Sequence, residues 1–182
     1  MAATLKVLEH DGLNALTVEG IAAAAGVGKA TIYRWWPSRI ALVLEAIEQL
    51  PELHTPDKGS LVEDLRALLT DLSELLVSTP LGGVLAHLGS DTTGRDPEVR
   101  EYLRRRMAPS IALVDRAVQR GELPADTDTE TLVYLTVGPV INRVFFGTPP
   151  DDEYIDLVVR TMAAGFPVAM TQRSNERRTA GA

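Results

Sequence analysis

The stretch TVEGIAAAAGVGKATIYRWWPSRIAL, residues 17–42, decides the fold of this chain. Thr17 is a residue type favoured as a helix N-cap, and it begins a short helix with Ile21 on its inner face. Gly26 supplies the left-handed conformation that a tight turn requires. A second short helix is expected over about Lys29–Trp35. This order of short helix, glycine turn and short helix predicts a helix-turn-helix.

The two short helices divide their residues into an inner and an outer set. Small residues allow the helices to cross closely, and these are Ala22, Ala23 and Ala25. The apolar residues expected in the core are Val27, Ile32, Trp35 and Trp36. The outer arc of the second helix carries Lys29, Ala30, Thr31, Tyr33 and Arg34. Cationic and small side chains together suit a helix that enters the major groove of DNA.

The pattern Thr17-Val-x-x-Ile21-Ala22-x-x-Ala25-Gly26-Val27-x-Lys29-x-Thr31-x-Tyr33-x-x-Trp36-x-Ser38-Arg39-x-x-Leu42 resembles the signature of the TetR family of transcriptional regulators. The resemblance implies a DNA-binding surface formed by Thr17, Gly28, Lys29, Ala30, Thr31, Tyr33, Arg34 and Arg39. At the end of the second short helix, Trp35 and Trp36 replace the pattern aromatic-x-Phe that is more usual in the family. Family members usually have further residues before the position of Met1, often a basic arm, and the sequence leaves open whether Met1 is the native start.

Charge and composition restrict the class of protein. The 182 residues carry a formal net charge of −7 and include no cysteine, which excludes disulfides and thiolate metal sites and favours a cytoplasmic location. No acidic residue lies between Gly20 and Leu44, whereas 14 Lys and Arg face 20 Asp and Glu from Pro51 onward. This distribution favours one DNA-binding face on an acidic body. We expect no secretory signal and no membrane partner, because the most apolar stretch, Leu132–Phe146, is too short to span a bilayer.

Helical periodicity predicts an all-α fold of about nine helices. A three-helix helix-turn-helix domain is expected first and a helical ligand-binding and dimerisation bundle after it. The predicted boundaries are 1–50 for the DNA-binding domain, 51–59 for a linker, 60–172 for the second domain and 173–182 for a disordered tail.

Local signals place the helix starts and stops. A first short piece over Thr4–His10 should stop at Asp11-Gly12. Ser60 and Glu63 fit a capping box, and Asp96-Pro97 is typical of a helix start. Later helices are expected over about Thr129–Phe146 and Asp151–Met170.

The C-terminal half also resembles a common variant of the TetR C-terminal domain, through Arg120-Gly-Glu-Leu-x-x-Asp126-x-Asp128. In the family the last two long helices pair with those of a second subunit. These helices are more apolar here than one buried face requires, which fits an isologous homodimer, although a central helix buried in a monomer is the alternative. The predicted interface comprises Leu132, Leu135, Val140, Val144, Phe145, Ile155, Val158, Val159 and Met162.

The resemblance also implies a cavity for a small-molecule effector, with apolar walls and few polar groups. The candidates are Leu72, Leu76, Leu85, Leu88, Tyr102, Met107, Ser110, Ile111 and Asn142. Each of these residues, taken singly, is also compatible with ordinary core.

No catalytic constellation is present in the sequence, so we expect no enzyme, no cofactor and no metal site. The three histidines, His10, His54 and His87, are far apart and lack metal-ligand spacing. The resemblance to the TetR family implies a repressor that is released from palindromic operator DNA by a hydrophobic or amphipathic effector. The alternative is a helical small-molecule-binding protein that has lost specific DNA binding. The identity of the effector, the operator, the target genes and the sign of regulation cannot be read from the residues.

Overall fold

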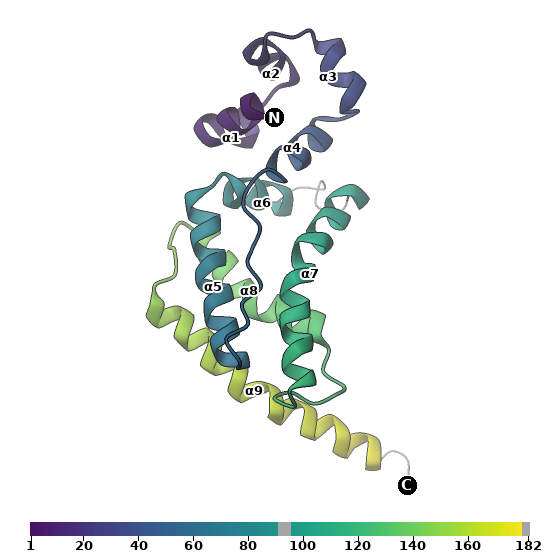
Figure 1. Ribbon diagram of the computed structural model, residues 1–182, viewed down its shortest axis with the longest axis vertical. Helices are drawn as coiled ribbons and strands as arrows, with labels where there is room; N and C mark the ends of the chain where they lie inside the picture. The colour runs from purple at the N-terminus through teal and green to yellow at the C-terminus, as the bar shows by residue number, and fades with distance from the viewer. Residues whose placement is uncertain (91–95, 180–182) are drawn as a thin grey trace. The chain divides into compact units, whose positions relative to one another are not determined.

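The computed structural model describes the backbone of residues 1–90 and 96–179, and the side chains of these residues except 89–90 and 166–179. Every regular element in these ranges is a helix, which confirms the all-α prediction (Figure 1). The helices are α1 Ala2–Ala15, α2 Val18–Ala25, α3 Lys29–Trp35, α4 Arg39–Ile47, α5 Leu61–Ser78, α6 Leu81–Ser90, α7 Pro97–Gln119, α8 Thr129–Phe145 and α9 Asp152–Thr179.

The chain divides into two compact units. The first consists of Met1–Glu52 and Glu74–Arg106, and the second of Leu53–Ser73 and Met107–Ala182. The predicted domain boundaries at residues 50 and 60 remain a prediction.

In the first unit, α1 packs against α2, α4 and α6. The core is aliphatic and includes Leu8, Leu13, Leu16, Ile21, Leu42, Val43, Ile47 and Val84. Gly12 has φ 71° and ψ 176°, so the helix breaks at the predicted place. Helical structure nevertheless resumes and continues to Ala15, five residues beyond the predicted His10.

Side-chain caps fix the starts of several helices, and those formed by Thr17 and Ser60 are predicted from the sequence. Thr17 accepts from the Gly20 N–H at 3.0 Å, Ser38 from the Ala41 N–H at 3.0 Å, and Asp128 from the Thr131 N–H at 3.0 Å. The Ser60 hydroxyl oxygen accepts from the Glu63 N–H at 3.3 Å. Each of these bonds satisfies a backbone donor that the first helical turn leaves unpaired.

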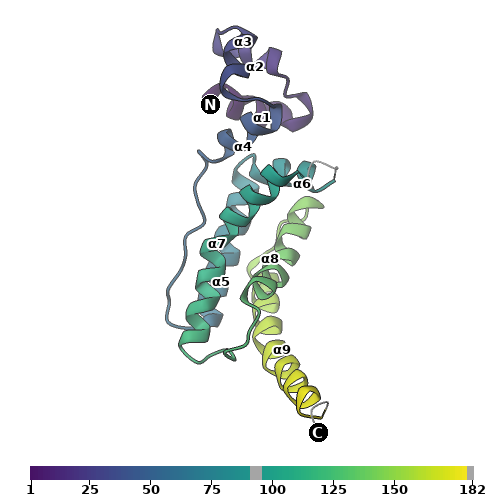
Figure 2. The ribbon, with the colours of Figure 1, turned by 90° about the vertical axis from the view of Figure 1, so that its right-hand side faces the viewer.

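In the second unit, α8 packs against α9 (Figure 2), and a charged clasp joins the start of α5 to the turn after α7. Asp64 is fully buried and accepts from the Arg120 guanidinium at 3.0 Å and from the Lys58 N–H at 2.5 Å. Glu122 accepts from the Leu61 N–H at 2.6 Å and from Arg120 at 2.5 Å. Gly121 has φ 78°, a conformation that glycine adopts without strain.

The last helix, α9, extends further than the sequence predicts. The backbone of α9 is helical to Thr179, so the predicted helix end near Met170 is wrong, and the tail boundary at residue 173 remains a prediction. Residues 180–182 lie outside the described chain.

Within the described ranges no single helix is long and apolar enough to cross a membrane. The helices α5 and α6, which are bent by 90° relative to each other, together have the length and composition of a membrane span, but buried core helices can have the same length and composition.

Candidate nucleic-acid interface

The turn between α2 and α3 has the geometry that a helix-turn-helix requires. Gly26 lies in the left-handed region with φ 67° and ψ 30°. Its N–H donates to the Ala23 carbonyl at 3.2 Å, and the Val27 N–H donates to the Ala22 carbonyl at 2.9 Å. These two bonds satisfy the last carbonyls of α2 and redirect the chain into α3. Ile32 is buried and anchors α3 to the first unit.

The predicted DNA-binding residues lie in a single unit on and around α3. Tyr33 is 52% exposed, and Thr17, Gly28, Lys29, Ala30 and Arg34 are also exposed. Thr31 is half-buried, which leaves part of its side chain accessible. The exposed set combines two cations with an alanine and a glycine that do not obstruct close approach to bases.

Lys29 does not stand free at the start of α3. Its ammonium forms an ion pair with Glu19 of α2, and both side chains are more than half exposed. The hydrogen bond from Lys29 lowers the pKa of the Glu19 carboxyl. Sequence reasoning missed this pair because the two residues meet only when the turn folds α3 back toward α2.

Arg39 at the start of α4 has a structural bond in addition to its predicted role. Its guanidinium donates to the Leu16 carbonyl at 3.3 Å and is partly buried. This bond links α4 to the residue that precedes the Thr17 cap. An arginine carries five N–H donors, so further donors remain for a phosphate.

The prediction that Val27, Trp35 and Trp36 are core residues fails for the first two. Val27 is 41% exposed and Trp35 is 68% exposed, because α3 has seven residues and buries only Ile32. Trp36 is half-buried, and its indole N–H donates to the Glu45 carboxylate of α4 at 2.6 Å. Trp36 therefore connects α3 to α4, whereas Trp35 faces solvent.

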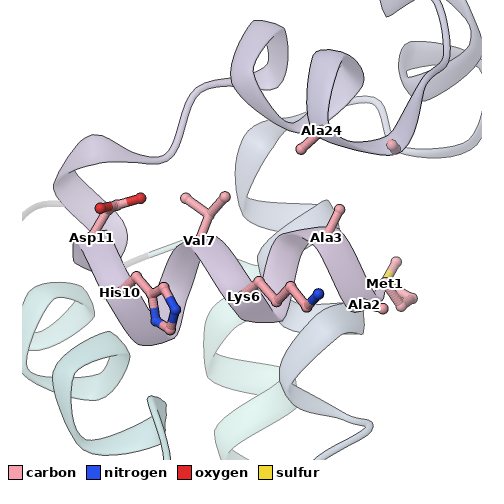
Figure 3. A pocket seen from close by; sticks show the side chains of 9 residues that line it. Met1, Ala2, Ala3, Lys6, Val7, His10, Asp11 and Ala24 are labelled. Atoms are coloured by element: carbon pink, nitrogen blue, oxygen red, sulfur yellow. The ribbon is translucent and has the colours of Figure 1, made fainter.

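A groove of about 590 Å³ lies between α1 and the end of α2. Figure 3 shows Lys6, His10 and Asp11 on the α1 side and Ala24 on the α2 side. Its ionisable groups include both signs, so its charge does not select for a polyanion as the surface of α3 does.

The predicted effector-binding residues are divided between the two units. In the first unit Leu76, Leu88 and Tyr102 are buried and Leu85 is half-buried. In the second unit Leu72 and Ser110 are buried, and Met107 and Ile111 are half-buried. Asn142, also in the second unit, is exposed. All of these assignments stay predictions.

Burial within the single chain narrows the predicted dimer interface. Five of the predicted residues are buried in the core of the second unit, so they offer no surface to a partner: Leu132, Val140, Ile155, Val158 and Val159. Leu135 and Phe145 are exposed, and Val144 and Met162 are half-buried. An interface on α8 and α9 remains a prediction that rests on these four residues.

Comparisons with known proteins agree with this geometry. The profile described as "Bacterial regulatory proteins, tetR family" matches residues 1–46, and that described as "Tetracyclin repressor-like, C-terminal domain" matches residues 55–162. The HTH-type transcriptional regulator YdeS of Bacillus subtilis is 32% identical over 87% of this chain and 84% of its own length. The DNA-binding transcriptional repressor TetR of Mycobacteroides abscessus is 28% identical over 87% of each chain.

A solved structure leads to the same family. The crystal structure of the TetR family transcription regulator SCO0332 superposes with a TM-score of 0.69 at 30% identity, over 90% of this chain and 93% of that one. The present chain has the same helical fold, with a helix-turn-helix formed by α2 and α3, and the family profiles match both of its halves. The chain therefore belongs to the TetR family of transcriptional regulators.

Proposed function

We propose that this regulator is a repressor that inserts α3 into the major groove of operator DNA. The observation that carries the proposal is the exposed face of α3, where Lys29, Tyr33 and Arg34 surround the small residue Ala30. The cations bind phosphates, and a small side chain lets the helix approach the edges of the bases. The repressor role draws on the relative from Mycobacteroides abscessus, which bears that description.

The regulator acts in this proposal as a two-fold homodimer in the cytoplasm. Exposed apolar side chains of α8 and α9, such as Leu135 and Leu157, support a self-association surface in the second unit. A two-fold dimer presents two copies of α3, so the operator is a near-palindrome with half-sites one helical turn, or a multiple of it, apart.

In this proposal, a hydrophobic or amphipathic small molecule with a hydrogen-bonding group binds the regulator and releases it from DNA. Three hydroxyls in the described part of the chain are buried without a hydrogen-bond partner, those of Thr4, Tyr102 and Ser110. An unpaired buried hydroxyl costs free energy, and a ligand that pairs with it recovers that cost. Two of these residues belong to the predicted effector set: Tyr102, in the first unit, and Ser110, in the second. Burial raises the pKa of Tyr102. The protein is a binding protein and not an enzyme in this proposal.

The experiment is selection of duplexes from a random-sequence DNA library by the full-length protein, followed by measurement of affinity at several salt concentrations. We expect a near-palindromic site whose affinity falls steeply with salt. Arg34→Ala should weaken binding about ten-fold and leave the oligomeric state unchanged. Recovery of no preferred sequence would overturn the repressor proposal and favour a helical ligand-binding protein without specific DNA binding.

A further inference from the structure

Trp35 is the least expected surface residue of the first unit. Its indole is 68% exposed at the end of α3, although tryptophan is a residue that folding normally buries to a large extent. The neighbouring Trp36 is half-buried and bonded to Glu45, so Trp36, and not Trp35, connects α3 to α4. Trp35 shares the exposed surface of α3 with Tyr33 and Arg34, and Trp, Tyr and Arg are the residue types that contribute most at binding surfaces.

Helix geometry places Trp35 on one flank of the exposed face of α3. With a rotation of about 100° per residue, the buried Ile32 defines the inner side and Arg34 lies near the centre of the outer side. Tyr33 and Trp35 then fall on opposite flanks, each to one side of Arg34. Both aromatic side chains are more than half exposed.

The width of the major groove gives these two flanks different partners. A helix with its side chains is about 10–12 Å across and the major groove is about 12 Å wide, so a helix in the groove faces one sugar-phosphate wall on each side. The outer side of α3, where Ala30 lies, faces the bases, and the long side chain of Arg34 extends to a phosphate. The two flanks meet the two strands.

We propose that Trp35 is a DNA-contacting residue that packs its indole against the deoxyribose of one strand and donates its Nε1–H to a phosphate of that strand. Tyr33 contacts the opposite strand, so the two aromatic side chains centre α3 between the walls of the groove. This inference rests on the proposed function, because it requires α3 to lie in the major groove.

Two contacts hold Trp35 in place for this role. The guanidinium carbon of Arg34 lies 6.0 Å from the centre of the Trp35 ring, on its face. The bond from Trp36 to Glu45 fixes the end of α3 against α4, which restrains the backbone from which Trp35 projects. The indole carries no charge, so its contribution differs from that of Lys29, Arg34 and Arg39 in being nearly independent of salt.

Fluorescence provides a direct test, because Trp35 and Trp36 are the two tryptophans of the chain. In full-length protein with Trp36→Phe, all tryptophan emission comes from Trp35. We expect addition of the duplex selected from the random library to shift this emission and to protect it from acrylamide quenching. The difference between wild-type and Trp35→Phe spectra gives the same information if Trp36→Phe does not fold.

Affinity measurements separate the two parts of the contact. Trp35→Ala should weaken binding of the selected duplex about ten-fold, which is the scale of an aromatic contact with nucleic acid, with the slope of log K against log salt unchanged. Trp35→Phe keeps a ring but loses the N–H donor, and it should fall between wild type and Trp35→Ala. Arg34→Ala is the ionic comparison and should reduce the salt slope by about one. Val77→Ala removes apolar surface from an exposed position in the same unit and should bind as wild type does.

The outcomes distinguish this inference from the proposed function. If wild-type protein binds its selected duplex and Trp35→Ala binds it equally well, with no change in Trp35 emission, the Trp35 contact is wrong and the regulator assignment survives. If wild-type protein selects no duplex, both fail. A change of oligomeric state in Trp35→Ala would assign the indole to a protein contact and would also overturn the inference.

Discussion

Glu19 lies one position before the stretch Gly20–Leu44, which has no acidic residue, yet the fold places its carboxylate in an ion pair with Lys29. Lys29 is the first residue of α3, where the unpaired N–H groups of a helix disfavour a cation. The carboxylate therefore compensates a local repulsion, and it also neutralises a cation that is a candidate for contact with DNA. A phosphate that approaches Lys29 has to replace Glu19.

Glu19→Gln should raise the affinity for mixed-sequence duplex DNA several-fold and steepen the salt dependence, because Lys29 becomes available to a phosphate. Lys29 lowers the pKa of Glu19, so acidification should remove this masking only below the ordinary titration range of a carboxyl. Binding isotherms at several salt concentrations provide the measurement. Asp152→Asn, at an exposed position in the first turn of α9, changes the net charge equally and is the control. Equal behaviour of the two variants would attribute the effect to net charge.

The residue-scale features that sequence reasoning found are those with a local signal. Thr17 and Ser60 cap the helix that follows each of them, and Gly26 supplies the left-handed conformation of the turn. The direction of Trp35 has no local signal, because a seven-residue helix with one buried residue leaves its flanks free to face the core or solvent.

At the scale of elements, α6 shows how adjacent glycines take different roles. A Cβ added to Gly82 would lie 2.4 Å from the backbone carbonyl oxygen of Leu76, so α6 can approach the end of α5 only without a side chain there. A Cβ at Gly83 would meet nothing within 4 Å. Gly83 instead lines a cleft of about 210 Å³ between α1 and α6, together with Leu8 and His87.

Gly82→Ala should lower the free energy of unfolding by about 1–3 kcal/mol, because backbone atoms must shift to admit the methyl group. Gly83→Ala should raise it by about 0.5–1 kcal/mol, since alanine favours the helix and the space is open. Urea denaturation of both variants gives the comparison, with one glycine serving as control for the other. Equal effects of the two substitutions would contradict the close approach at Gly82.

The extent of elements was predicted less well than their existence. The helices α2 and α3 begin and end where the sequence places them, because a cap and a glycine mark their limits. The continuation of α1 past Gly12 was not predicted, because glycine commonly stops a helix. The continuation of α9 to Thr179 was not predicted, because the polar residues at the end of the chain are of a kind that commonly lies outside helices. Which apolar residues of α8 and α9 face the core was also beyond sequence reasoning, because nearly every turn of these helices carries apolar residues on more than one side.

At the scale of the whole molecule, exposed apolar side chains are numerous in the second unit. They belong to α8, its end and α9: Tyr134, Leu135, Phe145, Phe146 and Leu157. A single unit gains stability by burying such residues, so their exposure supports the proposed self-association through α8 and α9.

Leu135→Glu should convert the proposed dimer into a monomer, because a carboxylate placed in an apolar interface loses its hydration without gaining a partner. Operator affinity should then fall by about two orders of magnitude or more, since one helix-turn-helix contacts a single half-site. Light scattering and binding to the selected duplex provide the two readouts. Val62→Glu, at an exposed apolar position on α5 of the same unit, should leave both unchanged. A Leu135→Glu dimer of normal affinity would place the interface elsewhere.

The charged clasp of the second unit has a consequence for how the protein can be cut. Residues 53–60 have no helix or strand and are rich in turn-forming residues, which are the usual marks of a site for proteolytic nicking. Their backbone, however, is engaged: the Pro56 carbonyl accepts from Arg116 at 2.6 Å and the Lys58 N–H donates to Asp64. A protease must draw such a segment into an extended form, which here means breaking bonds to charged groups first. Limited digestion should therefore spare the segment that composition alone would choose as the cleavage point.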